Sequence, residues 1–381
     1  MKSVVVASVV RTPIGRGTRG SLRDVRPDDL VATVIRAAVE RSGLDPALLQ
    51  DHCLGTAYPE GKQGSNLARR ASLLAGLGVE LPGSTVNRFC ASSLQALRQA
   101  AHAIWAGEAK AYLVSGVESA SQVGRTTREE DKHPYLSADG IADVYIPMGL
   151  TAENVADRYG ITRQAMDTFA LRSHQRAVAA QQDGRTAREI LPVTVPAGTV
   201  VRTDDGPRKD TTLERLAALP SAFREGGRVT AGNSCPLNDG AVAAVITSET
   251  LARREGLRPR ARILATAVSG VDPAYMGIGP IGAIRAVLAA RRVKIGDVDV
   301  VEFNEAFAAQ VLAVCQVVGI DTDTQLNPAG GAIALGHPFG MTGLRLVGTL
   351  LNNLETRGGT LGLATLCVGG GQGMAVLLER I

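Results

Sequence analysis

Strand-like and helix-like patterns of apolar residues alternate along the first part of the chain. A continuous apolar run over 4–10 predicts a strand that is buried on both faces. Apolar residues on one side of 28–41 predict a helix that ends at Gly43. The same signals predict strands over 52–57 and 111–115 and helices over 66–76 and from residue 94 onward. This alternation is typical of an α/β domain built around a mostly parallel sheet.

The second half of the chain repeats this order. Its predicted elements are strands over 262–268, 298–303, 361–367 and 374–379 and helices over 282–291 and 342–354. A short glycine-rich link, 369–373, joins its last two strands. The equivalent strands of the first half, 111–116 and 239–246, are far apart in the sequence. The segment between them is therefore expected to be an insertion in the first half.

The expected insertion, 118–240, is richer in polar, charged, proline and glycine residues than its surroundings. Helical patterns over 151–159, 163–182 and 211–219 predict a mostly helical subdomain. Thr211 and Glu214 have the spacing of a capping box at the start of the third helix. The predicted division is a first half of 1–117 plus 241–260, the insertion, and a second half of 261–381.

Composition narrows the class of protein. With 381 residues, 45% hydrophobic and 20% charged, the chain is expected to be globular, soluble and built from several units. An aromatic content of 3% and a net charge of +4 give no support for nucleic-acid binding. Five scattered cysteines without a C-x-x-C pair support neither a zinc site nor a redox motif. The odd number and low density of the cysteines fit a reducing cytosol, and no signal-like or membrane-spanning apolar run is evident, so a cytoplasmic location is expected.

Cys90 is the first residue with candidate chemistry. Apolar residues at helical spacing begin at Leu94, so Cys90 lies at or just before a helix start. The positive end of the helix dipole favours a thiolate there, which makes Cys90 a candidate nucleophile. This stretch alone fits a buried structural cysteine equally well.

Three later segments carry further candidates. Asn304 follows a strand, His337 precedes the helix over 342–354, and Cys367 ends a strand before Gly369. Taken singly, these residues fit a helix cap, a loop histidine and a core cysteine. Taken together with Cys90, they indicate a nucleophile, an activating base and a proton shuttle. Bare glycine N–H groups beside Cys367 could form an oxyanion hole.

These segments resemble the thiolase family, and within it the bacterial degradative 3-ketoacyl-CoA thiolases (acetyl-CoA C-acyltransferases). The similarity covers essentially the whole chain and is carried by 304–307, 330–338 and 367–373, with support from 148–156 and 230–241. It implies two duplicated βαβαβ-type halves in a five-layered αβαβα arrangement, with a loop domain inserted in the first half. It also implies acyl transfer between a 3-ketoacyl-CoA and CoA.

The resemblance assigns a role to each candidate. Cys90 is expected to carry the acyl group, and His337 to activate it and help bind the thioester oxygen. Asn304 is expected to hold a water at that oxygen, and Cys367 to move the proton. The backbone N–H groups of Cys90 and Gly369 are expected to form a second oxyanion hole.

By the same resemblance, CoA is a co-substrate, and neither a permanently bound cofactor nor a metal is expected. Arg208 is a candidate contact for a CoA phosphate, although a solvated surface arginine explains it equally well. Cys235 stands where many relatives have serine near the CoA arm. The expected partners are acyl-CoA, CoA and a second or further copies of the chain, as a homodimer or homotetramer.

The sequence departs from the family pattern at several positions. Ser93 stands where glycine is frequent, and Pro147 stands where short-chain biosynthetic members often carry histidine. Ala329 and Met341 replace a usual asparagine and a frequent cysteine. Pro147 favours the degradative reaction with broader acyl chains. Asn304 argues against the ketosynthase branch, which has a second histidine there.

Two other functions remain open. One is a short-chain acetyl-CoA acetyltransferase that works in the condensing direction. The other is a non-catalytic thiolase-like protein that binds acyl-CoA. Such a protein would be expected to have lost Cys90, His337 or Cys367, and all three are present.

Overall fold

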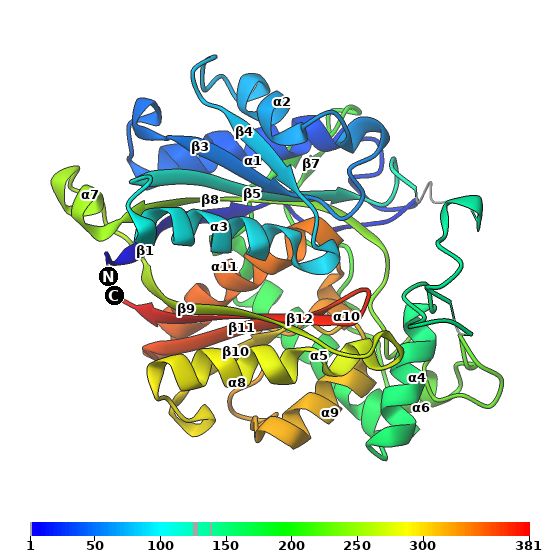
Figure 1. The fold of residues 1–381 in the computed structure, drawn as a ribbon. Coiled ribbons are helices and arrows are strands. Elements are labelled where there is room, and N and C mark those ends of the chain that lie inside the picture. Colours follow the sequence, from blue (N-terminus) through cyan, green and yellow to red (C-terminus); the bar gives the residue numbers. More distant parts are fainter. Residues whose placement is uncertain (1, 125–128, 138) are drawn as a thin grey trace.

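Helices and strands form five layers, and the strands of each half of the chain make up one strand layer (Figure 1). The computed structural model describes residues 2–124, 129–137 and 139–381. Helices α1 and α2 cover the outer face of the first sheet, and α8 and α9 cover the outer face of the second. Helices α3 and α11 lie between the sheets. The predicted five-layered thiolase fold is thus the arrangement observed.

The first half contains the following elements: β1 (Val4–Arg11), β2 (Gly15–Arg16), α1 (Pro27–Ser42), β3 (Asp51–Gly55), α2 (Leu67–Leu74), β4 (Gly83–Val86), α3 (Ser92–Ala106), β5 (Ala111–Ser119), β8 (Asn238–Ser248) and α7 (Glu249–Arg254). The second half contains β9 (Ala261–Gly270), α8 (Pro280–Arg291), β10 (Val300–Phe303), α9 (Ala308–Val318), α10 (Ala332–Leu335), α11 (Phe339–Arg357), β11 (Leu361–Val368) and β12 (Gln372–Arg380). Every residue of β1 is buried, as its uninterrupted apolar sequence predicts for a strand covered on both sides.

The pairing of the strands confirms the predicted repeat. Strand order is β10-β11-β12-β9 in the second half and β3-β5-β8-β1 in the first, with β4 added at the edge. The pair β10–β11 is parallel like β3–β5, and β11–β12 is antiparallel like β5–β8. A short β1–β9 pairing joins the two halves into one ten-stranded sheet.

The expectation of a mostly parallel sheet is wrong. Within the described residues the parallel pairs are β3–β4, β3–β5 and β10–β11, and antiparallel pairs outnumber them. A parallel neighbour requires a crossover, usually a helix, whereas β11 passes into β12 through the short glycine-rich turn. Strands β11 and β12 therefore run antiparallel, and β5 and β8, which the inserted segment separates, pair in the same antiparallel way.

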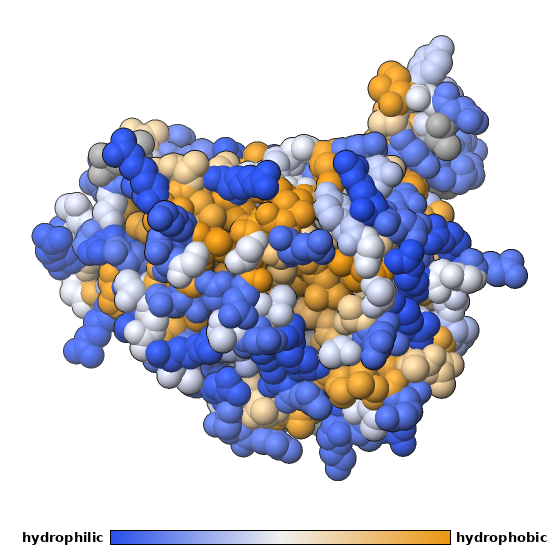
Figure 2. Space-filling model, turned by 90° about the horizontal axis from the view of Figure 1, so that it is seen from below, coloured by the Kyte–Doolittle hydropathy of each residue, from blue (hydrophilic) through white to orange (hydrophobic). Residues whose placement is uncertain are grey.

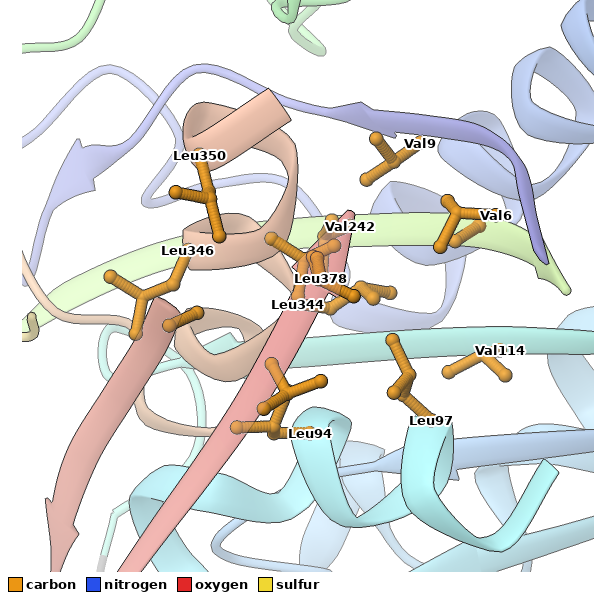
Figure 3. Close-up of a cluster of buried hydrophobic side chains, with 14 of the residues drawn as sticks. Val6, Val9, Leu94, Leu97, Val114, Val242, Leu344, Leu346, Leu350 and Leu378 are labelled. Atoms are coloured by element: carbon orange, nitrogen blue, oxygen red, sulfur yellow. The ribbon is translucent and has the colours of Figure 1, made fainter. Parts of the chain in front are cut away.

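The core lies where α3 and α11 meet the sheets. Figure 3 shows Leu94 and Leu97 of α3 and Leu344 of α11 in one cluster with Val114 and Val242 of the first sheet. Leu378 of β12 closes the cluster from the second sheet. Because α11 is buried along most of its length, its position is fixed by both halves of the fold.

The segment between β5 and β8 lies outside the ten-stranded sheet. It contains α4 (Met148–Arg158), α5 (Arg163–Gln182), the two-stranded pair β6 (Val193–Thr194) and β7 (Val200–Val201), and α6 (Leu213–Ala217). Helices α4 and α5 pack against α9 of the second half. Helix α6 is capped by Thr212, whose Oγ1 accepts from the backbone N of Arg215, so the predicted capping role of Thr211 is wrong. The exact division at 118–240 stays a prediction.

The outer side of the second half is seen in Figure 2. Hydrophilic residues surround this face, and apolar residues are visible between them. None of the helices within the described residues has the length and apolar character to cross a membrane.

Candidate active site

Cys90 lies in one turn of 3-10 helix immediately before α3, at the predicted place. The turn is held from within: Asn87 Oδ1 accepts from the Phe89 backbone N at 2.8 Å, and Ser92 Oγ donates to the Phe89 carbonyl at 2.6 Å. Phe89 has a φ of +43°, a left-handed conformation that costs energy in a residue other than glycine. The Cys90 side chain is partly exposed. The hydrogen bonds therefore hold a strained turn that places the Cys90 thiol just before the N-terminus of α3.

His337 directly precedes Pro338, the N-cap residue of α11, and its ring is buried. Its Nδ1 lies 2.7 Å from Thr342 Oγ1, and that hydroxyl donates to the Pro338 carbonyl at 2.8 Å. Since the Thr342 proton is already used, Nδ1 of His337 carries the hydrogen and Nε2 is the acceptor. Burial lowers the pKa of His337 to about 3, with a smaller contribution from Arg345. The imidazole is neutral and offers Nε2 as a base.

Asn304 faces this nitrogen. It follows β10, and its Nδ2 lies 3.3 Å from Nε2 of His337. Its Oδ1 is buried and has no hydrogen-bond partner among the described residues. Helix α9 begins later, at Ala308, with Phe307 at the N-cap position, so Asn304 is not a helix cap. A buried amide oxygen without a partner is suited to accept from a water or a ligand.

Cys367 lies near the end of β11 opposite Gly373 of β12, and it is 1% exposed. Burial raises the pKa of the Cys367 thiol, and the nearby sulfurs of Cys90 and Cys235 raise it further. Cys235 is anchored by its backbone N, which donates to the Ala306 carbonyl at 3.0 Å. Three thiols from separate segments thus interact, and Cys367 is held in its protonated form.

Contacts between the two halves bring these groups together. A Cβ at Gly369 would lie 3.6 Å from the Phe89 ring, so the glycine turn touches the Cys90 turn. Ser93 Oγ donates to the Met341 carbonyl at 3.1 Å and accepts from the Leu344 backbone N at 3.0 Å. The hydroxyl of Ser93 therefore fastens the start of α3 to the start of α11.

A second contact between the halves centres on Glu118, which the sequence did not single out. Its buried carboxylate accepts from the backbone N of Ala57 at 2.8 Å and of Gly340 at 2.9 Å. Gly340 has no room for a side chain, because a Cβ there would lie 2.5 Å from the Val117 carbonyl oxygen. The start of α11 therefore sits tightly against the ends of β3 and β5.

Arg208 lies in a pocket between the inserted segment and both halves of the fold. Arg16 and Arg215 line the same pocket, and Ser234, the neighbour of Cys235, forms another part of its wall. Burial lowers the pKa of Arg208, and the nearby Arg16 lowers it further, as expected for cations held close together. Asp210 also lines the pocket and forms an ion pair with Arg215, so Arg16 and Arg208 supply the excess positive charge that suits an anionic group. The described residues contain no group of three or more His, Cys, Asp or Glu side chains arranged to hold a metal ion.

Comparison with known proteins identifies the fold family. The family model for the N-terminal domain of thiolase matches residues 4–250, and the model for the C-terminal domain of thiolase matches residues 257–380. The chain belongs to the thiolase family. The predicted membership and the predicted class of acyltransferase enzyme are both confirmed.

Similar proteins span the whole chain. Beta-ketoadipyl-CoA thiolase of Pseudomonas aeruginosa is 46% identical over 403 residues, covering 100% of both chains. The crystal structure of Bacillus anthracis acetyl-CoA acetyltransferase superposes with a TM-score of 0.93 at 39% identity, covering 100% of this chain and 99% of that one. Human mitochondrial 3-ketoacyl-CoA thiolase, solved in complex with CoA, gives a TM-score of 0.91 at 36% identity, covering 100% and 98%.

Proposed function

We propose that this chain transfers an acyl group between a 3-ketoacyl-CoA and CoA through a thioester on Cys90. The observation that carries the proposal is the contact of two unlike loops: the turn that presents Cys90 and the glycine turn that follows Cys367. The degradative direction is favoured by relatives whose names are beta-ketoadipyl-CoA thiolase and 3-ketoacyl-CoA thiolase.

The first step is cleavage of the bond between C2 and C3 of the substrate. Nε2 of His337 takes the proton of the Cys90 thiol, and the sulfur attacks C3. The oxyanion at C3 accepts from the backbone N–H groups of Cys90 and Gly369. When the C2–C3 bond breaks, its electrons pass to C2 as an enolate. Cys367 gives its proton to C2, acetyl-CoA leaves, and the remaining acyl group stays on Cys90.

The second step returns the enzyme to its starting state. Cys367, now a thiolate, takes the proton of the CoA thiol, and the CoA sulfur attacks the acyl carbon. The Cys90 thiolate leaves and recovers its proton from His337. In the first step, Nε2 of His337, once it carries the Cys90 proton, and a water on Oδ1 of Asn304 donate to the thioester oxygen of the departing enolate. The raised pKa of Cys367 suits a group that must be protonated before each cleavage.

CoA is the proposed co-substrate, bound along the inserted segment. Its phosphates would meet Arg208 in the arginine-lined pocket, and its pantetheine arm would pass Cys235 toward Cys90. We also propose a homodimer or homotetramer as the working form. A cytoplasmic location belongs to the same proposal, because a small, odd number of scattered cysteines suits a reducing compartment.

Condensation of two acetyl-CoA molecules is the second candidate reaction, because the fold superposes closely on an acetyl-CoA acetyltransferase. The same residues would run the steps in reverse. Forward and reverse rates measured side by side distinguish the two candidates.

The test is to trap the acyl-enzyme. Acetoacetyl-CoA and longer 3-ketoacyl-CoA substrates, including beta-ketoadipyl-CoA, are mixed with the protein without free CoA, and the digested protein is weighed by mass spectrometry. The expected acyl group lies on the peptide that contains Cys90, and the Cys90→Ala variant is inactive and unlabelled. Cys235→Ser is the matched thiol control and keeps the label. Labelling of another residue, or turnover by Cys90→Ala, would refute the proposal.

A further inference from the structure

The two proposed oxyanion donors lie on separate halves of the fold, so something must fix their separation. Cys90 belongs to the turn before α3, and Gly369 belongs to the turn between β11 and β12. Gly370 and Gly371, which follow Gly369, have φ values of +75° and +80°. A turn built from consecutive glycines has few conformational restraints of its own. One restraint is a backbone hydrogen bond from the Val271 N to the Gly371 carbonyl at 2.7 Å, and side chains supply another.

Arg88 supplies a contact from the Cys90 turn. Its Nη1 donates to Gln372 Oε1 at 2.9 Å, and its Nε donates to Gln95 Oε1 of α3 at 3.0 Å. The guanidinium plane thus bonds one glutamine on each half of the fold. Because the donors of arginine are fixed in a rigid fork, the two bonds set the angle between the turns as well as their distance.

Gln372 completes the link. While its Oε1 accepts from Arg88, its Nε2 donates to the carbonyl of Gly369 at 3.2 Å. Gln372 is itself paired in β12, opposite Val368 and Gly270, so its backbone is anchored in the sheet. The side chains therefore connect the turn of Cys90 to the carbonyl of Gly369 through two hydrogen bonds.

We propose that Arg88 and Gln372 are positioning residues that hold the backbone N–H groups of Cys90 and Gly369 aimed at one point. The inference rests on the proposed function, because those two groups are the proposed oxyanion hole. Neither side chain needs to touch the substrate. Their loss would leave both donors present but less well placed, and a misplacement of this kind lowers the rate of the chemical step rather than binding.

The experiment is a double-mutant cycle on Arg88→Met and Gln372→Met, read as kcat and KM for thiolysis of acetoacetyl-CoA. Each single variant is expected to lower kcat by about 10- to 100-fold with KM within about twofold. The double variant is expected to be no slower than the slower single variant, because either change breaks the same link. Arg88→Lys, which keeps one donor, is expected to recover part of kcat. Arg98→Met on α3 is the matched control and keeps the wild-type kcat.

Three results would overturn the inference: unchanged kcat in either single variant, losses that multiply in the double variant, or a loss of kcat that is accompanied by an equal rise in KM. Urea unfolding of each variant shows whether it is folded, and Gln372→Glu replaces Gln372→Met if the latter is not. Gln372→Glu keeps the bond to Arg88 but cannot donate to Gly369, so its expected kcat is also lowered. If the wild-type Cys90 is not acylated, the proposed function fails; if it is acylated and the variants are as fast, only this inference fails.

Discussion

Replacing Glu118 with glutamine is expected to loosen the junction between the halves. The carboxylate of Glu118 accepts from the backbone N of Ala57, after β3, and from that of Gly340, in the first turn of α11. Its other oxygen accepts from Gln63 Nε2 at 2.6 Å. Gln63 cannot turn its amide around without loss, because its Oε1 already accepts from the Ser119 backbone N at 2.7 Å.

The size of the effect follows from these bonds. In Glu118→Gln, one oxygen becomes an NH2 group, which faces either Gln63 Nε2 or the two backbone N–H groups. In the first orientation Gln63 Nε2 keeps Thr56 Oγ1 at 2.9 Å and the Tyr58 carbonyl at 2.8 Å as acceptors, but two NH2 groups then meet at the former 2.6 Å contact. In the second orientation the two backbone N–H groups lose their acceptor. Either way a buried hydrogen bond is lost, at a cost of about 1–3 kcal/mol. The remaining bonds to the oxygen lose their charge assistance, which adds about 1 kcal/mol. The free energy of unfolding is therefore expected to fall by about 2–4 kcal/mol.

Urea unfolding at pH 7.5, followed by circular dichroism, measures this change. The control is Glu40→Gln on the exposed face of α1, which is expected to change the free energy of unfolding by less than about 0.5 kcal/mol. A Glu118→Gln variant as stable as the Glu40→Gln control would show that the carboxylate does not hold the two halves together.

Two further predictions concern binding and pH. Arg208→Ala is expected to raise KM for CoA by about 10-fold with little change in kcat, since a charge-assisted contact to phosphate contributes about 1.5 kcal/mol or more. Steady-state kinetics with CoA as the varied substrate test this expectation. An unchanged KM for CoA would contradict it. Burial lowers the pKa of His52 to about 4, so the unfolded chain binds a proton there that the folded chain does not, and stability falls as pH drops below 6.5. At pH 5 the buried, neutral His52 is expected to lower the free energy of unfolding by about 2 kcal/mol relative to pH 7.5. Urea unfolding of a His52→Gln variant tests this. A variant with the same pH dependence of stability as the wild type would contradict the role of His52.

Local patterns were sufficient to predict most of the elements, because helices such as α1 bury one face only and strands such as β1 are continuous apolar runs. The helix predicted over 163–182 is α5 (Arg163–Gln182), and the helix stop at Gly43 is a left-handed C-cap residue. Helix α9 (Ala308–Val318) was missed. Most of its residues are buried and apolar, so its sequence lacks the polar face that reveals a helix. Strand direction was mispredicted because the apolar pattern of a strand contains no information about its partner.

The candidate residues could be placed on strand ends and helix starts from the sequence, but their partners could not. Thr342, which fixes the tautomer of His337, lies one helical turn along α11 and looks like an ordinary helical threonine. Gln372 looks like part of a glycine-rich turn, and its bond to Arg88 spans 284 positions. Contacts of this kind depend on how two elements pack, which local patterns do not specify. Ser93 was noticeable only as a departure from the family pattern.

The duplicated fold explains why two similar positions carry different chemistry. Cys90 and His337 occupy equivalent places, each before a helix of the central layer that leads into a strand. Cys90, in the first half, is partly exposed, so its thiol can reach a substrate. His337, in the second half, is buried against Asn304 and Thr342. Burial keeps the imidazole neutral, and a base must be neutral to take the thiol proton. The difference in burial between equivalent positions therefore separates nucleophile from base, and the contacts of Ser93 and Glu118 keep the two within one site.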